Sequence, residues 1–351
     1  MTYFTSNRSI FFKVVIILPV VILILFLFNI SLGSVSIPLP EVAKALFTGS
    51  AEKESWLNII FHFRLPKALT AVLAGAALGV SGLQMQTLFR NPLAGPYVLG
   101  ISSGASLGVA LVVLLNYSVI GIFTSLQLNN WVVIIASSIG SFIVLICVSI
   151  VSLKVRDSMT LLIVGLMFGS IAGASVSVLQ FFSDAKQLQI YMVWTFGSLG
   201  GLGWDELKIL CFFIVIGLLI SMISFKPLNT LLLSENYART MGLNVTKARI
   251  LIILSTSLLA GGITAFCGPI AFIGLAVPHL TRLVFNTSDH KVLIPAVALS
   301  GIIIMLFCDT VAQIPSFQSV LPINAVTSLI GAPVVIWLIV SKGGIKNSYH
   351  R

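Results

Sequence analysis

Long apolar runs with almost no charge follow one another along this chain. Each run has about 16–23 residues, the length of helix that crosses the hydrocarbon core of a bilayer. Of the 351 residues, 58% are hydrophobic and only 9% are charged, against roughly 25% charged in an ordinary soluble domain. A soluble fold of this size would need far more charged surface. The sequence therefore predicts an all-α polytopic membrane protein.

Breaks at charged residues, Pro and Gly divide the chain into about ten predicted spans. The stretch from Ile250 to Thr281 carries no formal charge and is too long for one helix without a large tilt. We therefore expect it to break at Gly268-Pro269. The predicted spans are 11–32, 66–87, 97–115, 131–152, 159–181, 207–225, 250–268, 270–285, 292–312 and 323–341.

The distribution of Lys and Arg predicts the orientation, because these residues accumulate in the cytoplasmic loops of membrane proteins. With ten spans and a cytoplasmic N-terminus, 14 of the 20 Lys and Arg residues fall inside. Joining the two short spans beside Gly268-Pro269 would leave only 9 inside and remove the asymmetry. With acidic residues included, the inner segments carry +11 and the outer segments −1, so the net charge of +10 reflects topology and requires no nucleic acid. We expect both termini in the cytoplasm.

The sequence lacks the usual signatures of catalysis and metal binding. There is no GxxxxGK[ST], HExxH or GxSxG motif, so we expect no enzyme activity, metal or cofactor in this chain. No acidic residue falls in the middle of a predicted span, and only Asp309 approaches the outer end of one. This argues against an ion-coupled carrier, because such carriers keep charged residues within the membrane. The cysteines are interpreted as buried apolar residues: Cys147, Cys211, Cys267 and Cys308.

The longest predicted inner loop, residues 226–249, carries apolar residues that a solvated loop does not need. It reads KPLNTLLLSENYARTMGLNVTKAR, a pattern typical of a short helix that ends near Gly242. Two interpretations stay open: the helix lies against a partner protein, or it covers the inner ends of the spans.

Small residues four positions apart occur in three predicted spans, as in closely packed membrane helices. They either pack helices together or line a pathway. A weaker echo, LAG at 73–75 and again at 259–261, lies in spans of opposite direction and is compatible with an inverted five-helix repeat. The spaced glycines are Gly75 and Gly79, Gly104 and Gly108, and Gly165, Gly169 and Gly173.

Ordered blocks between about residues 55 and 341 resemble the FecCD family of permease subunits. The family serves binding-protein-dependent ABC importers for iron-siderophores, haem and cobalamin. The blocks are RLPK (64–67), AGAALGVSGLQMQTLFRNPLAGPYVLGISSGASLG (74–108), WTFGSLGGLGW (194–204), SENYARTMGL (234–243), GPIAFIGLAVPHLTR (268–282), SDHKVLIP (288–295), Asp309 and LIGAPVVIWLI (329–339).

The resemblance implies one permease domain over residues 1–351, with ten helices in the bacterial cytoplasmic membrane. It implies a second permease subunit, identical or different, which together with this chain surrounds a central pathway. It also implies that the subunits contact membrane lipid. It also implies cytoplasmic ABC ATPase subunits and an extracytoplasmic substrate-binding protein. The leading hypothesis is an importer of an iron chelate, siderophore or haem. The alternatives are a cobalamin importer permease, an ion-coupled secondary transporter and a non-transporting membrane scaffold.

The outer site residues follow from the resemblance by position. Arg64 and Lys67 match a basic pair that meets acidic residues of the binding protein, although Arg is more usual at the second position. The family often has a further basic residue where this chain has Gln313. An ELPxG pattern before the last helix reads VLPIN here, with Asn324 in place of Gly.

The inner site residues are carried over in the same way. Ser158 and Met159 match the inner gate region, at the start of the fifth predicted span. The residues that match the coupling helix, which seats in a groove of the ATPase, are Glu235, Ala238, Arg239 and Gly242.

Overall fold

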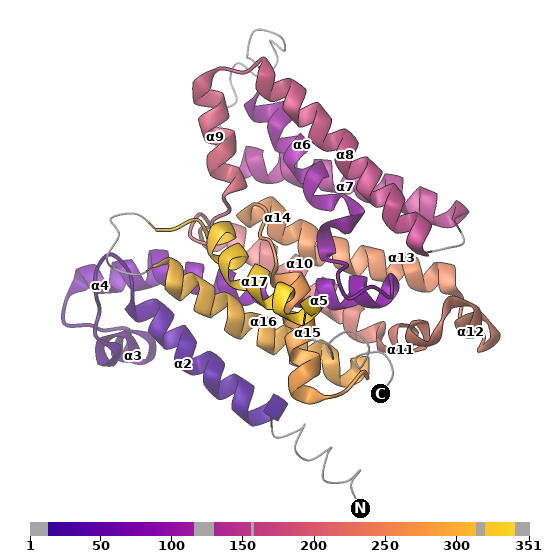
Figure 1. The fold of residues 1–351 in the computed structure, drawn as a ribbon. Coiled ribbons are helices and arrows are strands. Elements are labelled where there is room, and N and C mark those ends of the chain that lie inside the picture. The colour runs from indigo at the N-terminus through magenta and orange to yellow at the C-terminus, as the bar shows by residue number, and fades with distance from the viewer. Residues whose placement is uncertain (1–12, 116–129, 156–157, 314–319, 341–351) are drawn as a thin grey trace, which may run out of the picture. The chain divides into compact units, whose positions relative to one another are not determined.

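The computed structural model describes residues 13–115, 130–155, 158–313 and 320–340, and within these ranges it contains helices and no strands (Figure 1). The predicted all-helical class is confirmed. The chain forms two compact units that interleave in sequence: unit 1 comprises 1–83, 198–212 and 271–351, and unit 2 comprises 84–197 and 213–270. One permease domain over 1–351 stays a prediction. The charged residues of both termini and of 156–157, which the charge count included, lie outside the described residues.

In the described part of the chain, ten apolar helices overlap the ten predicted spans. Three of them are shorter than a span requires by length alone: Ile101–Val113, Ile273–Phe285 and Ile323–Trp337. The count of ten crossings and the inverted repeat therefore stay predictions. Seven are long and apolar enough to cross a membrane: Val14–Ser31, Glu54–Leu88, Asn130–Lys154, Ser158–Phe181, Trp204–Ile223, Val245–Cys267 and His290–Ala312.

Unit 1 is built around α16, which packs against α2, α15 and α17. α16 begins where the Asp289 side chain accepts a hydrogen bond from the backbone N–H of Lys291, satisfying one free donor of the first turn. A buried apolar core includes Ile30, Ile37 and Ile60. The elements are η1 (Lys13–Ile17), α2 (Leu18–Ser31), α3 (Leu39–Thr48), α4 (Glu54–Ile59), η2 (Ile60–Arg64), α5 (Leu65–Leu88), α15 (Ile273–Phe285), α16 (His290–Ala312) and α17 (Ile323–Val340).

In unit 2, α6 packs between α7 and α8, and the three helices run together in Figure 1. α10 (Trp204–Ile223) and α5 contribute residues to both units. The remaining elements are η3 (Pro96–Leu99), α6 (Ile101–Val113), α7 (Asn130–Lys154), α8 (Ser158–Phe181), α9 (Ala185–Thr195), α11 (Phe225–Leu233), α12 (Glu235–Thr240), α13 (Val245–Thr256), η4 (Ser257–Gly261) and α14 (Gly262–Cys267).

The predicted break at Gly268-Pro269 is confirmed. α14 ends at Cys267 and α15 begins at Ile273, and Gly268 adopts a φ of +76° that favours glycine. The second predicted span began too late, because the helix starts at Glu54 and passes through the π-helical turn η2 before α5. Arg64 therefore lies within a helix, one residue before α5.

The spaced glycines bring helices into backbone contact. A Cβ atom added at Gly75 of α5 would lie 2.3 Å from the carbonyl oxygen of Gly301 in α16. In unit 2, a Cβ atom on Gly104 of α6 would lie 2.6 Å from the carbonyl oxygen of Gly140 in α7. The packing interpretation therefore holds for α5 and α6. It does not extend to Gly173 of α8, where an added Cβ atom would meet nothing within 4 Å.

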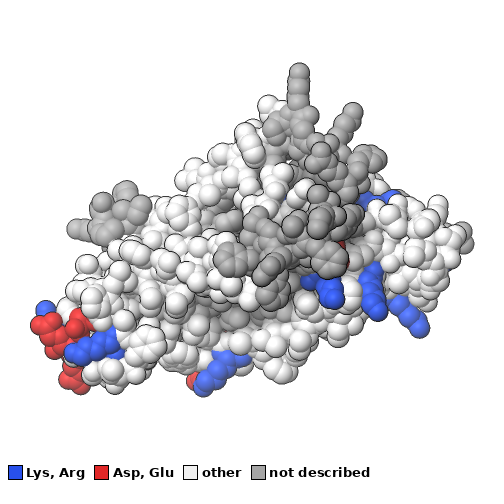
Figure 2. Space-filling model, turned by 90° about the horizontal axis from the view of Figure 1, so that it is seen from below, with Lys and Arg blue, Asp and Glu red and all other residues white. Residues whose placement is uncertain are grey.

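Most of the described surface on the face shown in Figure 2 is uncharged, and acidic side chains gather over α3 and α4. These short helices and α9 fall outside the predicted spans. α3 has Pro among its first residues and is followed by Gly49 in the left-handed conformation, a pair of signals typical of a helix start and stop. The charged residues of this segment are Glu41, Lys44, Glu52, Lys53 and Glu54.

Candidate functional site

Lys67 and Gln313, two of the predicted docking residues, converge on one carboxylate. The Lys67 ammonium lies 3.0 Å from Asp309 Oδ1, and the Gln313 amide donates to Asp309 Oδ2 at 2.7 Å. Asn29 of α2 also donates to Oδ2, at 2.9 Å. The side chain of Asp309 is only 2% exposed and that of Lys67 15%. We call these four residues the Asp309 cluster; it ties α2, α5 and α16 together through a buried charge that needs these partners.

Arg64 is held by the end of α2 and the loop that follows it. Its guanidinium donates to the carbonyl oxygens of Ile30 at 2.7 Å and Ser31 at 2.9 Å, and also to that of Val35. A cation is favourable at this position because the last carbonyls of a helix lack partners and carry partial negative charge. Arg64 is buried and its fork is engaged within the chain. Its predicted docking role stays a prediction.

The predicted coupling and gate residues meet in a buried network of unit 2. Arg249 of α13 donates to both carboxylate oxygens of Glu235, at 3.1 and 3.2 Å, and Ser158 at the start of α8 donates to Glu235 Oε1. Arg249 also donates to the carbonyl oxygens of Val155 at 2.8 Å and Ser152 at 3.4 Å, at the end of α7. We call Ser158, Glu235 and Arg249 the Glu235 network. Met159 is exposed beside it.

The other predicted coupling residues divide between two sides of α12. Ala238 is buried, whereas Arg239 and Gly242 are exposed. Tyr237 and Met241 are large, apolar in part and exposed on the same short segment. The Ser234 side chain caps α12 by accepting a hydrogen bond from the backbone N–H of Tyr237, which stabilises the first turn of the helix. The predicted short helix in loop 226–249 is confirmed, as two helices, α11 and α12.

Asn324, the departure from the family pattern, has a structural explanation. Its side-chain oxygen accepts a hydrogen bond of 3.0 Å from the backbone N–H of Ala271. Ala271 lies in the turn between Gly268-Pro269 and α15, where this backbone donor lies outside a helix. Asn324 therefore ties the start of α17 to the segment that leads into α15.

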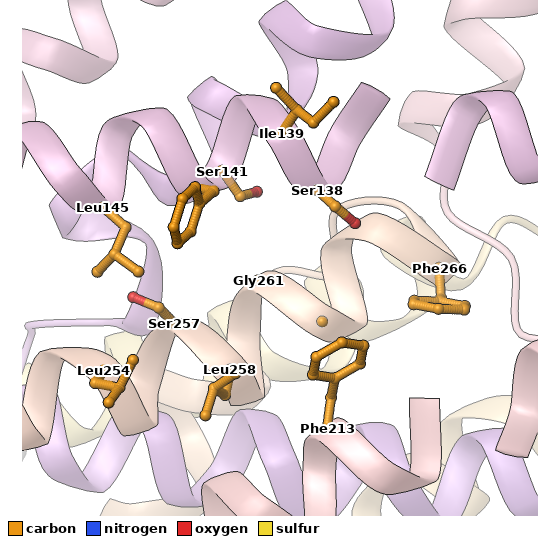
Figure 3. Close-up of a pocket in the computed structure, with 12 residues that line it drawn as sticks. Ser138, Ile139, Ser141, Leu145, Phe213, Leu254, Ser257, Leu258, Gly261 and Phe266 are labelled. Carbon is orange, nitrogen blue, oxygen red and sulfur yellow. The ribbon is translucent and has the colours of Figure 1, made fainter. Parts of the chain in front are cut away.

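An apolar pocket of about 350 Å³ lies in unit 2 among α7, α10, α13, η4 and α14 (Figure 3). None of its lining residues is charged. The hydroxyl groups of Ser141 and Ser257 on its wall donate to the carbonyl oxygens of Ile101 and Ile253. The pocket therefore suits an apolar group. In the part of the chain that the structure describes, no three His, Cys, Asp or Glu side chains gather as a group able to hold a metal ion.

Sequence reasoning did not assign roles to Asn29 and Arg249. Asn29 is a single amide in an apolar run, and Arg249 is one of several cations beside the predicted spans. A polar side chain at the end of a predicted span is a weak signal of a buried partner. Their partners lie in distant parts of the sequence or across a loop, so the pairing itself follows only from the fold.

Comparisons with known proteins agree over almost the whole chain. The sequence model of the FecCD transport family matches residues 21–341. The hemin transport system permease protein HmuU of Yersinia pestis is 35% identical over 327 residues, which cover 92% of this chain and 93% of that protein. The vitamin B12 import system permease protein BtuC of Salmonella typhi is 36% identical over 289 residues, which cover 81% of this chain and 86% of that protein.

A solved structure shares the fold as well. A chain from a metal-chelate type ABC transporter in an inward-facing conformation matches with a TM-score of 0.81 at 27% sequence identity. The match covers 94% of this chain and 99% of that chain.

Proposed function

The chain belongs to the FecCD transport family, and from this premise we propose that it imports an iron chelate, either haem or a ferric siderophore, as one subunit of an ATP-driven importer. It is a permease of the ABC importer type and a multi-pass protein of the bacterial inner membrane. The similarity to a hemin permease over nine-tenths of both chains carries the proposal of an iron chelate. The similarity to vitamin B12 permeases supports cobalamin as a second candidate substrate.

The permease has two partners in the membrane in this proposal, a second permease subunit and lipid. Large apolar side chains are exposed along α7 and α8, among them Ile143, Ile163 and Ile171. Contiguous apolar surface of this kind is stable only against lipid or another apolar protein surface. The second subunit is a copy of this chain or a related permease. We further propose that both termini face the cytoplasm, which puts the acidic α3–α4 segment on the outer side.

A cytoplasmic ATPase is the proposed energy source, and the exposed side of α12 is its proposed contact. Arg239 and Gly242 lie there beside Tyr237 and Met241, and exposed aromatic, Met and Arg side chains are enriched at protein interfaces. Glu235 and Ala238 are buried, so we propose that they shape α12 and do not touch the ATPase themselves. ATP hydrolysis belongs to the ATPase, and we assign no catalytic residue to this chain.

We expect Arg239→Glu to weaken ATPase association about ten-fold, because it reverses a charge at the proposed contact. The measurement is the amount of co-expressed ABC ATPase that purifies with the tagged permease in detergent. Lys208→Glu makes the same change on an exposed residue of α10, at the predicted outer side, and should leave the yield unchanged. Equal ATPase yields from wild type and Arg239→Glu would contradict the proposed contact.

The outer edge around Arg64 and Lys67 is the proposed docking site for the binding protein. Both side chains are held in place by partners within the chain: Lys67 forms an ion pair with Asp309, whereas Arg64 donates to neutral carbonyl oxygens and keeps its net charge. Fixed charges of this kind chiefly affect the rate of association and its dependence on salt. Gln313 adds no charge here and acts in the proposal only through Asp309.

We expect Lys67→Gln to slow capture of the purified binding protein about three-fold at low ionic strength, with the difference shrinking in high salt. Stopped-flow association kinetics measure the rate, while the amplitude separately reports the fraction of folded permease. Lys186→Gln removes another predicted outer cation, which is exposed on α9, and serves as the control. A rate that is the same for Lys67→Gln and wild type at every salt concentration would exclude this docking role.

A further inference from the structure

The Glu235 network joins three segments that meet at the predicted inner side of unit 2. Arg249 supplies the junction, because its fork reaches Glu235 on α12 and the last carbonyls of α7 together. Ser158 extends the connection to the first turn of α8 through the same carboxylate. The Arg249 side chain is 2% exposed, so water does not compete for these contacts.

Arginine suits this junction better than other cations. Its planar guanidinium holds five donors in a fixed geometry, so it can bind a carboxylate with one edge and backbone carbonyls with another. The last carbonyls of α7 carry partial negative charge, which favours a cation there. A displacement of Glu235 is then resisted unless the end of α7 and the start of α8 move with it.

α12 is a short helix with one buried and one exposed side. Its six residues bury Glu235 and Ala238 and expose Tyr237 and Arg239, and the exposed Met241 and Gly242 follow directly after it. A force applied to the exposed side reaches the spans through the buried side. The ion pair to Arg249 is a directional contact on that side, and the packing of Ala238 is not directional.

We propose that Arg249 is a positioning residue that transmits movement of α12 to the end of α7 and the start of α8, where the gate residues Ser158 and Met159 lie. The inference rests on the proposed function, in which an ATPase displaces α12. Arg249 then fixes how far the gate moves for a given movement of the coupling helix. It does not contact substrate, and loss of its side chain should separate the two movements without removing the ATPase contact.

The experiment uses the complete chain purified with its ATPase, with two pairs of spin labels in a background lacking the native cysteines. One pair reports α12, with labels at Asn236→Cys and Lys186→Cys. The other reports α8, with labels at Met159→Cys and Lys186→Cys. All three positions are exposed in unit 2. Pulsed electron paramagnetic resonance measures the distance between the two labels of each pair, with and without ATP and vanadate.

In Arg249→Gln, we expect the nucleotide-dependent shift of the α12 pair to persist and that of the α8 pair to fall below about half of its wild-type size. Lys247→Gln removes an exposed cation from the same helix and should preserve both shifts. A purely structural role for Arg249 would lower the yield of folded complex and leave both shifts intact in what remains. Full shifts of both pairs in Arg249→Gln would overturn the inference.

Two further results separate a failure of the inference from a failure of the variant to fold or of the proposed function. If Arg249→Gln does not fold, Ser158→Ala removes only the arm to α8; it should reduce the α8 shift, and an unchanged shift would overturn the inference. If wild-type permease binds no ATPase, or neither pair responds to nucleotide, the proposed function fails before Arg249 is tested.

Discussion

Asp309→Ala is expected to lower the free energy of unfolding by about 3–5 kcal/mol, the range for removing one partner of a buried ion pair. The change leaves the Lys67 ammonium without its counter-charge and two buried amides without their shared acceptor. The measurement is the denaturation midpoint and slope in detergent micelles. The loss should be much smaller when Lys67→Met accompanies Asp309→Leu, because an apolar pair leaves no unpaired charge.

Asp205→Ala is the matched control for this prediction. Asp205 also lies 3.0 Å from a lysine, Lys208, but the two side chains are 82% and 72% exposed. Water screens such a pair, so its removal should change stability very little. Equal losses from Asp205→Ala and Asp309→Ala would show that burial of the Asp309 cluster is not what makes it stabilising.

Gly82→Ala is expected to destabilise the protein by about 3 kcal/mol or more, at the upper end of overpacking effects. The added methyl carbon would lie 1.8 Å from the carbonyl oxygen of Gly274, so α5 and α15 must separate. Neither neighbour is a flexible side chain that could turn away. The measurement is the melting midpoint of the detergent-solubilised protein, followed by size-exclusion chromatography after heating.

Gly173→Ala provides the comparison, because the same methyl group on α8 would meet nothing within 4 Å. Alanine also has a higher helix propensity than glycine, so we expect no loss of stability. Equal melting midpoints of the Gly82→Ala and Gly173→Ala proteins would mean that α5 and α15 are not in backbone contact.

The sequence alone predicts where the apolar helices lie, because a helix that crosses a bilayer needs a long uncharged run and charged residues mark its ends. It also located the break at Gly268-Pro269, where glycine conformation and proline both interrupt a helix. It did not predict α3 and α9, which are too short to stand out as spans, or α4, which extends the second span at its start. Short helices depend on caps and tertiary packing, which a hydropathy pattern does not record.

The two polar clusters show a different limit. Lys67 and Asp309 lie at opposite ends of the sequence, and nothing near either residue indicates the other as its partner. The resemblance to a family placed Arg64 and Glu235 at contact sites with other proteins, but their burial gives both an internal role first. Positional carry-over assigns a residue to a region, whereas its partners follow from three-dimensional packing.

The absence of a mid-span carboxylate favours an ATP-driven mechanism over an ion-coupled one. Asp309, the acidic residue nearest to a predicted span, lies near the end of α16 and is already paired with Lys67. A carboxylate held by a cation and two amides is a poor site for reversible ion binding, because its charge is already compensated. In our account this leaves the ATPase as the energy source.

Uptake of radiolabelled metal chelate into proteoliposomes distinguishes an ATP-driven importer from an ion-coupled carrier. The vesicles contain the permease with its co-purified ATPase and binding protein, and haem, a ferric siderophore and cobalamin are assayed in parallel. We expect haem or the ferric siderophore to accumulate only with ATP and the ATPase, and ionophores to leave this uptake unchanged. Uptake that continues without the ATPase and stops when ionophores collapse the ion gradients would contradict this expectation.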